Sequence, residues 1–180
     1  YCDPAIWPQV DRGDTLGLFQ LEAPSTRQFS MKFKPRSERE VADLISVNRP
    51  GVVRAGMLNV YLRRRDGEEV VQLPHPLMED ITGRTFGIMV YQEQGIKVVQ
   101  QLAGFTVDEA EKVRKIMGKM LYDEMLKLEP QFVEGCLNNP EFITQNDDER
   151  WTPRECAVNI WNQLKASGVY SFNNSHAVGY

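Results

Sequence analysis

The stretch TVDEAEKVRKIMGK, residues 106–119, carries the clearest helix signal in the chain. Thr106 and Glu109 have the spacing of a capping box, in which the Thr side chain accepts from a backbone N–H and the Glu side chain reaches back to the start of the box. The pattern predicts a helix over 107–117. Because no strand-forming run of comparable length is present, the fold class that we expect is mainly α.

Two other helix starts have the same form. Ser37 and Glu40 open a predicted helix that runs to about residue 47. Thr152, followed by a proline at the first helical position, opens a predicted helix over 153–167, and Gly168, a residue that can take the left-handed conformation at a helix end, stops it. The remaining pattern predicts helices at 54–65, 91–103 and 121–138, loops at 67–76 and 139–151, and only two short β-like runs, at 70–71 and 87–90.

The composition is that of an ordinary globular chain. It has 180 residues, of which 42% are hydrophobic and 26% charged, enough for one domain with a real core. No run approaches the roughly 18 apolar residues of a membrane span, and the N-terminus lacks a signal-peptide pattern. The three cysteines, Cys2, Cys136 and Cys156, are too widely spaced for a disulfide framework or a paired metal site. We expect one helical domain over residues 1–180, with free thiols, in the cytoplasm.

Charge is divided into blocks along the chain. The net charge is -4, yet residues 27–65 hold ten Lys/Arg against three Asp/Glu, whereas residues 66–111 hold two against nine. Such asymmetry is typical of a surface that contacts a polyanion, although a solvated basic face gives the same counts. The candidates for contact with such a polyanion are Arg49, Arg54, Arg63 and Arg64.

The NRPG segment at 48–51 is predicted to present Arg49 rigidly. Pro50 fixes its own φ and restricts Arg49 to extended geometry, while Gly51 permits a turn. Arg49 either approaches a phosphate or is a paired residue of a structural turn, and both interpretations remain open.

The cations of the 107–117 helix project away from its apolar stripe. Arg114 and Lys115 lie on a different side from Val113 and Ile116, and Lys119 follows about one turn after Lys115. A guanidinium fork grips two phosphate oxygens at once, whereas an ammonium acts as a point charge. These cations can therefore converge on one anionic ligand, or they form the solvated face of an ordinary amphipathic helix.

Three polar blocks resemble the motifs of one enzyme family. The segments YQEQ (91–94), KVRKIMGK (112–119) and FNNSH (172–176) are similar, in order and spacing, to the YQEQ, RRAMGKK and FNKSH motifs of the bacterial replicative DNA polymerases, the C family typified by the polymerase III alpha subunit. Further segments resemble other blocks of that family in the same order: TLGLFQLE (15–22), NRPG (48–51), GIMVYQEQ (87–94) and LAGFT (102–106).

The resemblance places the chain in the fingers of such a polymerase, without the palm and thumb. We therefore expect a piece of a longer polypeptide, with no catalytic residue or metal ligand of its own and with Mg²⁺ held by palm aspartates elsewhere. In the family, the positions of Arg114 and Lys115 are usually both arginine and grip the triphosphate of the incoming nucleotide. By the same resemblance Lys119, Asn173 and His176 belong to the nucleotide pocket.

The implied function is part of a DNA-directed DNA polymerase that binds deoxynucleotide triphosphates and template-primer DNA, with the remaining polymerase domains and other replisome proteins as partners. Alone, the 180-residue chain is predicted to be inactive. Departures from the family pattern at Lys115, Met120 and Asn174 favour an alternative, a catalytically inactive module that binds DNA or a replication partner. An unrelated helical interaction protein is the third interpretation. The parent could be the main replicase, an error-prone paralogue or a phage-encoded version.

Two polar residues outside these sets are interpreted as structural. Glu93 has no second carboxylate in a motif with which to share a metal ion, and a two-metal site needs clustered carboxylates. His75, between two prolines, is predicted to be a loop residue.

Overall fold

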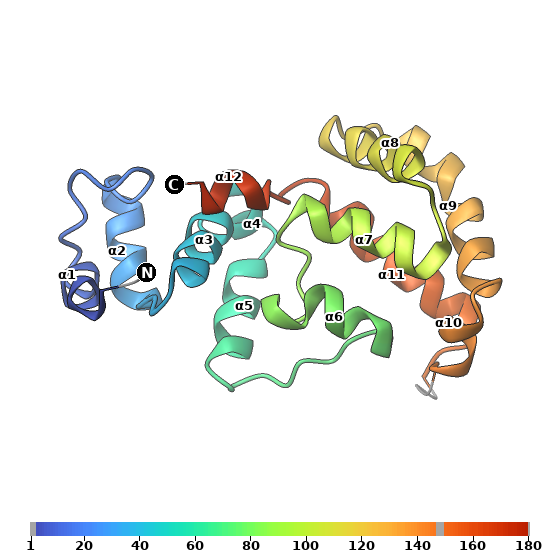
Figure 1. Ribbon diagram of the computed structural model, residues 1–180, viewed down its shortest axis with the longest axis horizontal. Coiled ribbons are helices and arrows are strands. Elements are labelled where there is room, and N and C mark those ends of the chain that lie inside the picture. The colour runs from blue at the N-terminus through green and yellow to red at the C-terminus, as the bar shows by residue number, and fades with distance from the viewer. Residues whose placement is uncertain (1–2, 147–149, 180) are drawn as a thin grey trace.

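The fold is mainly α, as predicted. The computed structural model describes residues 3–146 and 150–179, and within these ranges no strand forms, only an isolated bridge between Tyr91 and Phe172. Figure 1 shows an elongated arrangement with α1 and α2 at one end and α8 to α10 at the other. The elements are η1 (Pro4–Ile6), α1 (Trp7–Asp11), α2 (Pro24–Phe33), α3 (Glu38–Val47), α4 (Pro50–Arg54), α5 (Met57–Arg65), η2 (Pro76–Met78), α6 (Glu79–Thr82), η3 (Gly83–Thr85), α7 (Gln92–Ala103), α8 (Val107–Gly118), α9 (Tyr122–Leu137), α10 (Pro140–Thr144), α11 (Pro153–Ser167) and α12 (Asn174–Val178).

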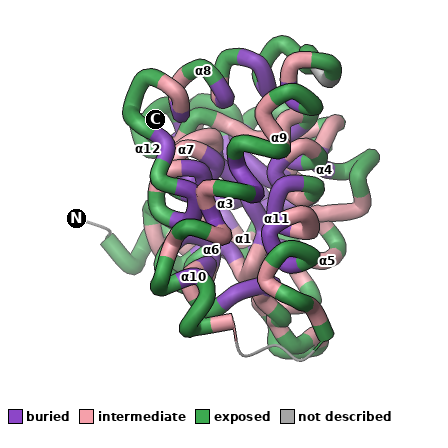
Figure 2. The backbone as a smooth tube through the Cα atoms, turned by 90° about the vertical axis from the view of Figure 1, so that its right-hand side faces the viewer, coloured by how far each residue is buried: buried purple, intermediate pink, exposed green. Residues whose placement is uncertain are grey.

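Apolar side chains form two separate cores. The larger, here called the C-terminal core, is built by α7, α8, α9 and α11 around Trp161, whose ring lies 4.9 Å from that of Phe132. The smaller N-terminal core takes residues from α2, α3, α4 and α5, and it is completed by Ile88, Val90 and Tyr91 and by Tyr170 and Ala177. Figure 2 shows the buried segments gathered inside the outer, exposed turns. The chain therefore leaves the N-terminal core and returns to it twice.

A glycine allows the closest helix contact of the C-terminal core. A Cβ atom at Gly135, on α9, would lie 2.2 Å from the carbonyl oxygen of Ala103, at the end of α7. Because a side chain at this position would meet backbone, α9 and α7 can approach this closely only while residue 135 has none.

Most of the predicted helices are confirmed within a residue or two at each end, and the three Ser and Thr caps are present. The capping box at Ser37 is only half formed. Ser37 accepts from the N–H of Glu40, but the carboxylate of Glu40 accepts from the N–H of Arg36 instead of Ser37.

Two local predictions are wrong. The helix expected at 54–65 is interrupted, because α4 already begins at Pro50 and Gly56, at φ 72°, separates it from α5. The loop expected at 139–151 contains α10, which Asn139 caps by accepting from the N–H of Glu141. Gly168 ends α11 as predicted, and it does so at a right-handed φ of -55° with its N–H bonded to carbonyl oxygens of α11.

Buried thiol and imidazole groups belong to the C-terminal core. Cys136 and Cys156 are buried and form no disulfide within the described residues, and Cys2 lies outside those residues. Burial raises the pKa of the Cys136 thiol to about 12. His75 lies before η2, outside the helices as predicted, but it is 1% exposed and stacks on Phe142 at 4.2 Å.

No helix in the described ranges combines the length and the apolar character needed to cross a bilayer.

Candidate functional site

The YQEQ and FNNSH blocks are joined by backbone hydrogen bonds. The N–H of Phe172 donates to Val90 O, and the N–H of Gln92 donates to Phe172 O, both at 2.8 Å. The carboxylate of Glu93 then accepts from the N–H of Asn174 at 3.0 Å, at the start of α12. Glu93 therefore fixes α12 to α7, which is a structural role of the kind predicted for it.

The KVRKIMGK block reaches the same place through Arg114. Its guanidinium donates to both carboxylate oxygens of Glu111, at 2.8 and 2.6 Å, and to Gln92 Oε1 at 3.3 Å. The ammonium of Lys115 lies 3.7 Å from Glu111 as well. Arg114 therefore holds the pKa of Glu111 below its ordinary value through the hydrogen bond between them. One carboxylate pairs with two of the three cations predicted to bind a triphosphate. Lys119 is exposed at the end of α8.

Asn173 and His176 lie on the first turn of α12. Asn173 Oδ1 accepts from the N–H of His176 at 2.8 Å and so caps the helix. The His176 ring stands edge-on to Phe172, with centroids 5.4 Å apart, and the residue is exposed. Next to them, Asn174 has a buried amide oxygen with no hydrogen-bond partner among the described residues.

Among the predicted DNA-contacting arginines, Arg63 and Arg64 share one acid. Both donate to Glu69, at 2.8 Å, and Arg64 also donates to Phe86 O. Arg54 is exposed and pairs with no other described residue. The guanidinium groups at 63 and 64 must therefore exchange Glu69 for any phosphate that they bind.

Arg49 takes the extended conformation predicted from Pro50, with φ -114° and ψ 147°. Its guanidinium donates to Tyr170 O at 3.2 Å and lies 4.6 Å from the centroid of the Phe172 ring. These contacts join the NRPG segment to the FNNSH block, as expected of a paired Arg49 in a structural turn. Contact of the same side chain with a phosphate stays a prediction.

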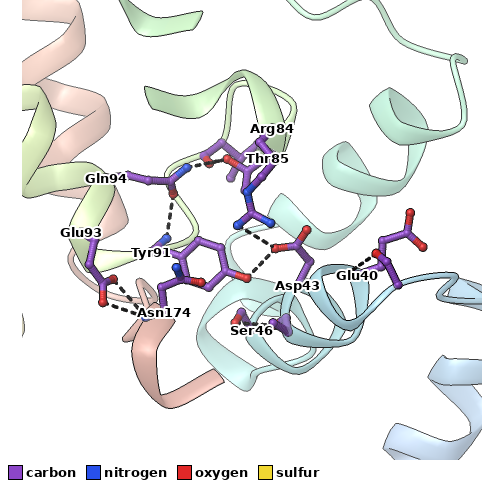
Figure 3. A network of polar contacts seen from close by, with 12 residues as sticks. Glu40, Asp43, Ser46, Arg84, Thr85, Tyr91, Glu93, Gln94 and Asn174 are labelled. Carbon is purple, nitrogen blue, oxygen red and sulfur yellow. Dashed lines mark hydrogen bonds and ion pairs between the residues drawn. The ribbon is translucent and has the colours of Figure 1, made fainter. Parts of the chain in front are cut away.

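A buried carboxylate that was not singled out from the sequence connects the N-terminal core to the YQEQ block. Asp43, on α3, accepts from the hydroxyl of Tyr91 at 2.5 Å and from that of Tyr61 at 3.0 Å, and Arg84 lies 3.5 Å away (Figure 3). Burial raises the pKa of Asp43, and the hydrogen bond from Tyr91 opposes that shift. An acid inside the apolar run VADLISV was the signal available in the sequence. For Glu111, the signal was its spacing of three residues from Arg114.

The three polar blocks thus meet at the N-terminus of α7, and this meeting point defines a helical module. Residues 1–140 match the family profile described as the bacterial DNA polymerase III alpha subunit finger domain. The chain belongs to that family.

Relatives match over nearly the whole chain. The alpha subunit of DNA polymerase III from Aquifex aeolicus is 34% identical over 178 residues, covering 99% of this chain and 14% of that protein. The Thermus aquaticus subunit is 35% identical over 183 residues, again with 99% and 14% coverage. An error-prone DNA polymerase from Corynebacterium efficiens is 31% identical over 179 residues, with 99% and 16% coverage. The chain thus spans 14 to 16% of the length of these relatives.

Proposed function

We propose that residues 1–180 act as one fingers segment of a cytoplasmic DNA-directed DNA polymerase in DNA replication, and that α8 and α12 bind the incoming deoxynucleotide triphosphate. The observation that supports this most directly is the meeting of the three blocks. Arg114 contacts Gln92, and Glu93 contacts Asn174, so cations of α8 and the first turn of α12 flank the same end of α7. Two elements far apart in the sequence thereby lie against one end of the same helix.

In this proposal the cations of the chain neutralise the negative charge of the triphosphate during the reaction. When a primer 3′-hydroxyl attacks the α-phosphate, negative charge grows on the leaving pyrophosphate, and preorganised cations stabilise it. Arg114 can donate two parallel hydrogen bonds to phosphate oxygens, while Lys115 and Lys119 act as point charges. Asn173 and His176, at the start of α12, contact the same triphosphate in this proposal. Because Glu111 already holds Arg114, a triphosphate must displace that carboxylate to bind.

Mg²⁺ would be held outside this chain. The described residues contain no group of three or more His, Cys, Asp or Glu placed to share an ion, so they do not fit a two-metal site. We assign the metal to palm aspartates of the parent polymerase, together with the remaining polymerase domains and other replisome proteins as partners.

The isolated 180-residue chain is expected to show no primer extension with Mg²⁺, because its described residues bring no carboxylate cluster to the reaction. The measurement is extension of a labelled primer by protein purified free of host polymerase. Extension by the pure chain would refute its assignment to the fingers.

Contact with template-primer DNA is proposed for Arg49, Arg54, Arg63 and Arg64. Each phosphate that a cation neutralises releases counterions, so affinity for duplex DNA should fall steeply with salt and show little sequence preference. Replacing both Arg63 and Arg64 by alanine is expected to reduce the salt slope by about 0.9 for each lost contact, measured by fluorescence anisotropy across a salt series. An unchanged slope would mean that the basic residues of the segment 27–65 form a solvated face and do not contact DNA.

The substitution at Asn174 favours the second candidate function, an inactive polymerase-derived module. Where the family commonly has lysine, this chain has an amide whose oxygen is buried and unpaired among the described residues, directly beside Glu93. The sequence upstream of this segment in the parent discriminates the two functions, since the enzyme requires the three palm aspartates and the module does not.

A further inference from the structure

A second charged region lies on the other side of the YQEQ block. The elements α3, α6, η3, α7 and α12 surround an open cleft of about 360 Å³, a volume within the usual range of ligand sites. Its charged lining residues are Arg39, Asp80, Arg84, Glu93 and Lys97. None of the three cations belongs to the set Arg114, Lys115 and Lys119.

Two neighbouring side chains fix the position of Arg84 in the cleft wall. The buried carboxylate of Asp43 lies 3.5 Å from its guanidinium, and the guanidinium carbon lies 5.4 Å from the centroid of the Tyr91 ring. Figure 3 shows Arg84 pointing between these two groups. Asp43 is itself fixed by the hydroxyls of Tyr61 and Tyr91, so Arg84 is positioned before any ligand arrives.

Arg39 and Lys97 are available at the rim. Both are exposed, and neither forms a hydrogen bond or ion pair with another described residue. They differ in this from Arg63 and Arg64, which would have to give up Glu69. A phosphate in the cleft would therefore meet two cations that no described acidic residue already binds.

We propose that this cleft holds the phosphodiester backbone of a single DNA strand, an inference that rests on the proposed DNA contact of the chain. The three cations are balanced by the carboxylates of Asp80 and Glu93 and by Asp43 behind the wall, so the cleft has little net charge. Its positive charge is available at Arg39 and Lys97, which no described acidic residue pairs. A phosphodiester carries one negative charge for each phosphate, which suits such a site, whereas a triphosphate concentrates several. Arg84 covers the ring of Tyr91, which leaves no open aromatic face for a base to stack on. Binding is therefore indifferent to base identity.

The test uses the 180-residue chain and a fluorescent oligo(dT) of about ten nucleotides, a length within the footprint of single-strand grooves. The double variant Arg39→Ala/Lys97→Ala should bind about tenfold more weakly at low salt, with the slope of log K against log salt smaller by about 0.7 for each lost contact. Oligo(dA) should give the same result. Both positions are exposed, and a thermal melt verifies that the variant is folded.

The matched control is Lys112→Ala/Lys127→Ala, which removes two exposed cations from α8 and α9, neither of which lines the cleft, and should leave affinity within about twofold of the parent chain. Equal weakening by both double variants would mean that only net charge matters, and would overturn the cleft assignment. Deoxythymidine triphosphate is the competing probe: if it binds the parent chain and loses affinity in the cleft variant while oligo(dT) does not, the cleft is a triphosphate site and the strand assignment is wrong. If the unmodified chain does not bind oligo(dT) or duplex DNA at low salt, the proposed DNA contact of the whole chain is wrong. If the unmodified chain binds and the cleft variant binds equally well, only the cleft assignment is wrong.

Discussion

Arg114→Ala, introduced into the full-length polymerase that carries this chain, is expected to lower nucleotide incorporation by about 10²-fold or more while leaving DNA affinity nearly unchanged. Loss of one preorganised donor at a site of developing phosphate charge has an effect of this order. The side chain is 33% exposed and, among the described residues, forms hydrogen bonds only with Glu111 and Gln92, so its removal should not disturb either core. Steady-state incorporation kinetics and primer-template anisotropy measure the two quantities separately.

Glu111→Gln should act in the opposite direction. It removes the carboxylate that competes with the triphosphate for Arg114, so the apparent KM for nucleotide should fall by about threefold, an effect of the size expected for an exposed ion pair. Lys115→Arg restores a second guanidinium and should leave KM unchanged or lower.

The matched control is Glu124→Gln on α9, which breaks a similar ion pair, with Lys127 at 2.7 Å, and should change neither kinetic constant. An Arg114→Ala enzyme within about twofold of the parent would show that α8 does not bind the triphosphate, because loss of such a donor costs far more.

Gly135→Ala should strongly destabilise the chain. The added Cβ would lie 2.2 Å from the backbone oxygen of Ala103, so α9 must move away from α7 or the peptide of Ala103 must shift. Overpacking of this kind costs about 3 kcal/mol, which corresponds to a decrease in Tm of roughly 5–10 °C for a chain of this size. Thermal and urea unfolding followed by circular dichroism measure the change.

Gly118→Ala provides the comparison, since a Cβ there meets nothing within 4 Å and Gly118 is the last residue of α8. It should be neutral or stabilise the chain by up to about 0.5–1 kcal/mol through helix propensity. Similar melting temperatures for the two variants would contradict the close approach of α9 and α7 at residue 135.

The helices were predictable from the sequence where a local signal determined them. Thr106 and Thr152 cap their helices through contacts three residues away, and such contacts depend on nothing else in the fold. The break in the predicted 54–65 helix at Gly56 was missed because glycine allows either sign of φ, and tertiary surroundings choose between them. α10 was missed because Asn139 and Pro140 read equally well as a loop and as a helix start.

The blocks of the candidate site were recognisable, but their partners were not. Nothing in the sequence shows that Glu93 fixes α12 or that Asp43 accepts from Tyr91, because these pairs are 81 and 48 residues apart. Glu111 differs, since its position one helical turn before Arg114 is a local signal. The basic block illustrates the limit of counting charges: Arg63 and Arg64 raise the local count, yet both are paired with Glu69.

The return of the chain to the N-terminal core has a consequence for its synthesis. Helices α2, α3 and α5 leave the ribosome first, but their core lacks Tyr170 and Ala177 until the last part of the chain is translated, on the order of ten seconds later. The C-terminal core closes between residues 78 and 164 and needs no such late partner. Although it is made second, it is expected to fold first, and the N-terminal helices remain exposed to chaperones and proteases in the interval. Contacts of such large sequence separation also slow folding, so refolding from denaturant should show the N-terminal core forming in the later phase.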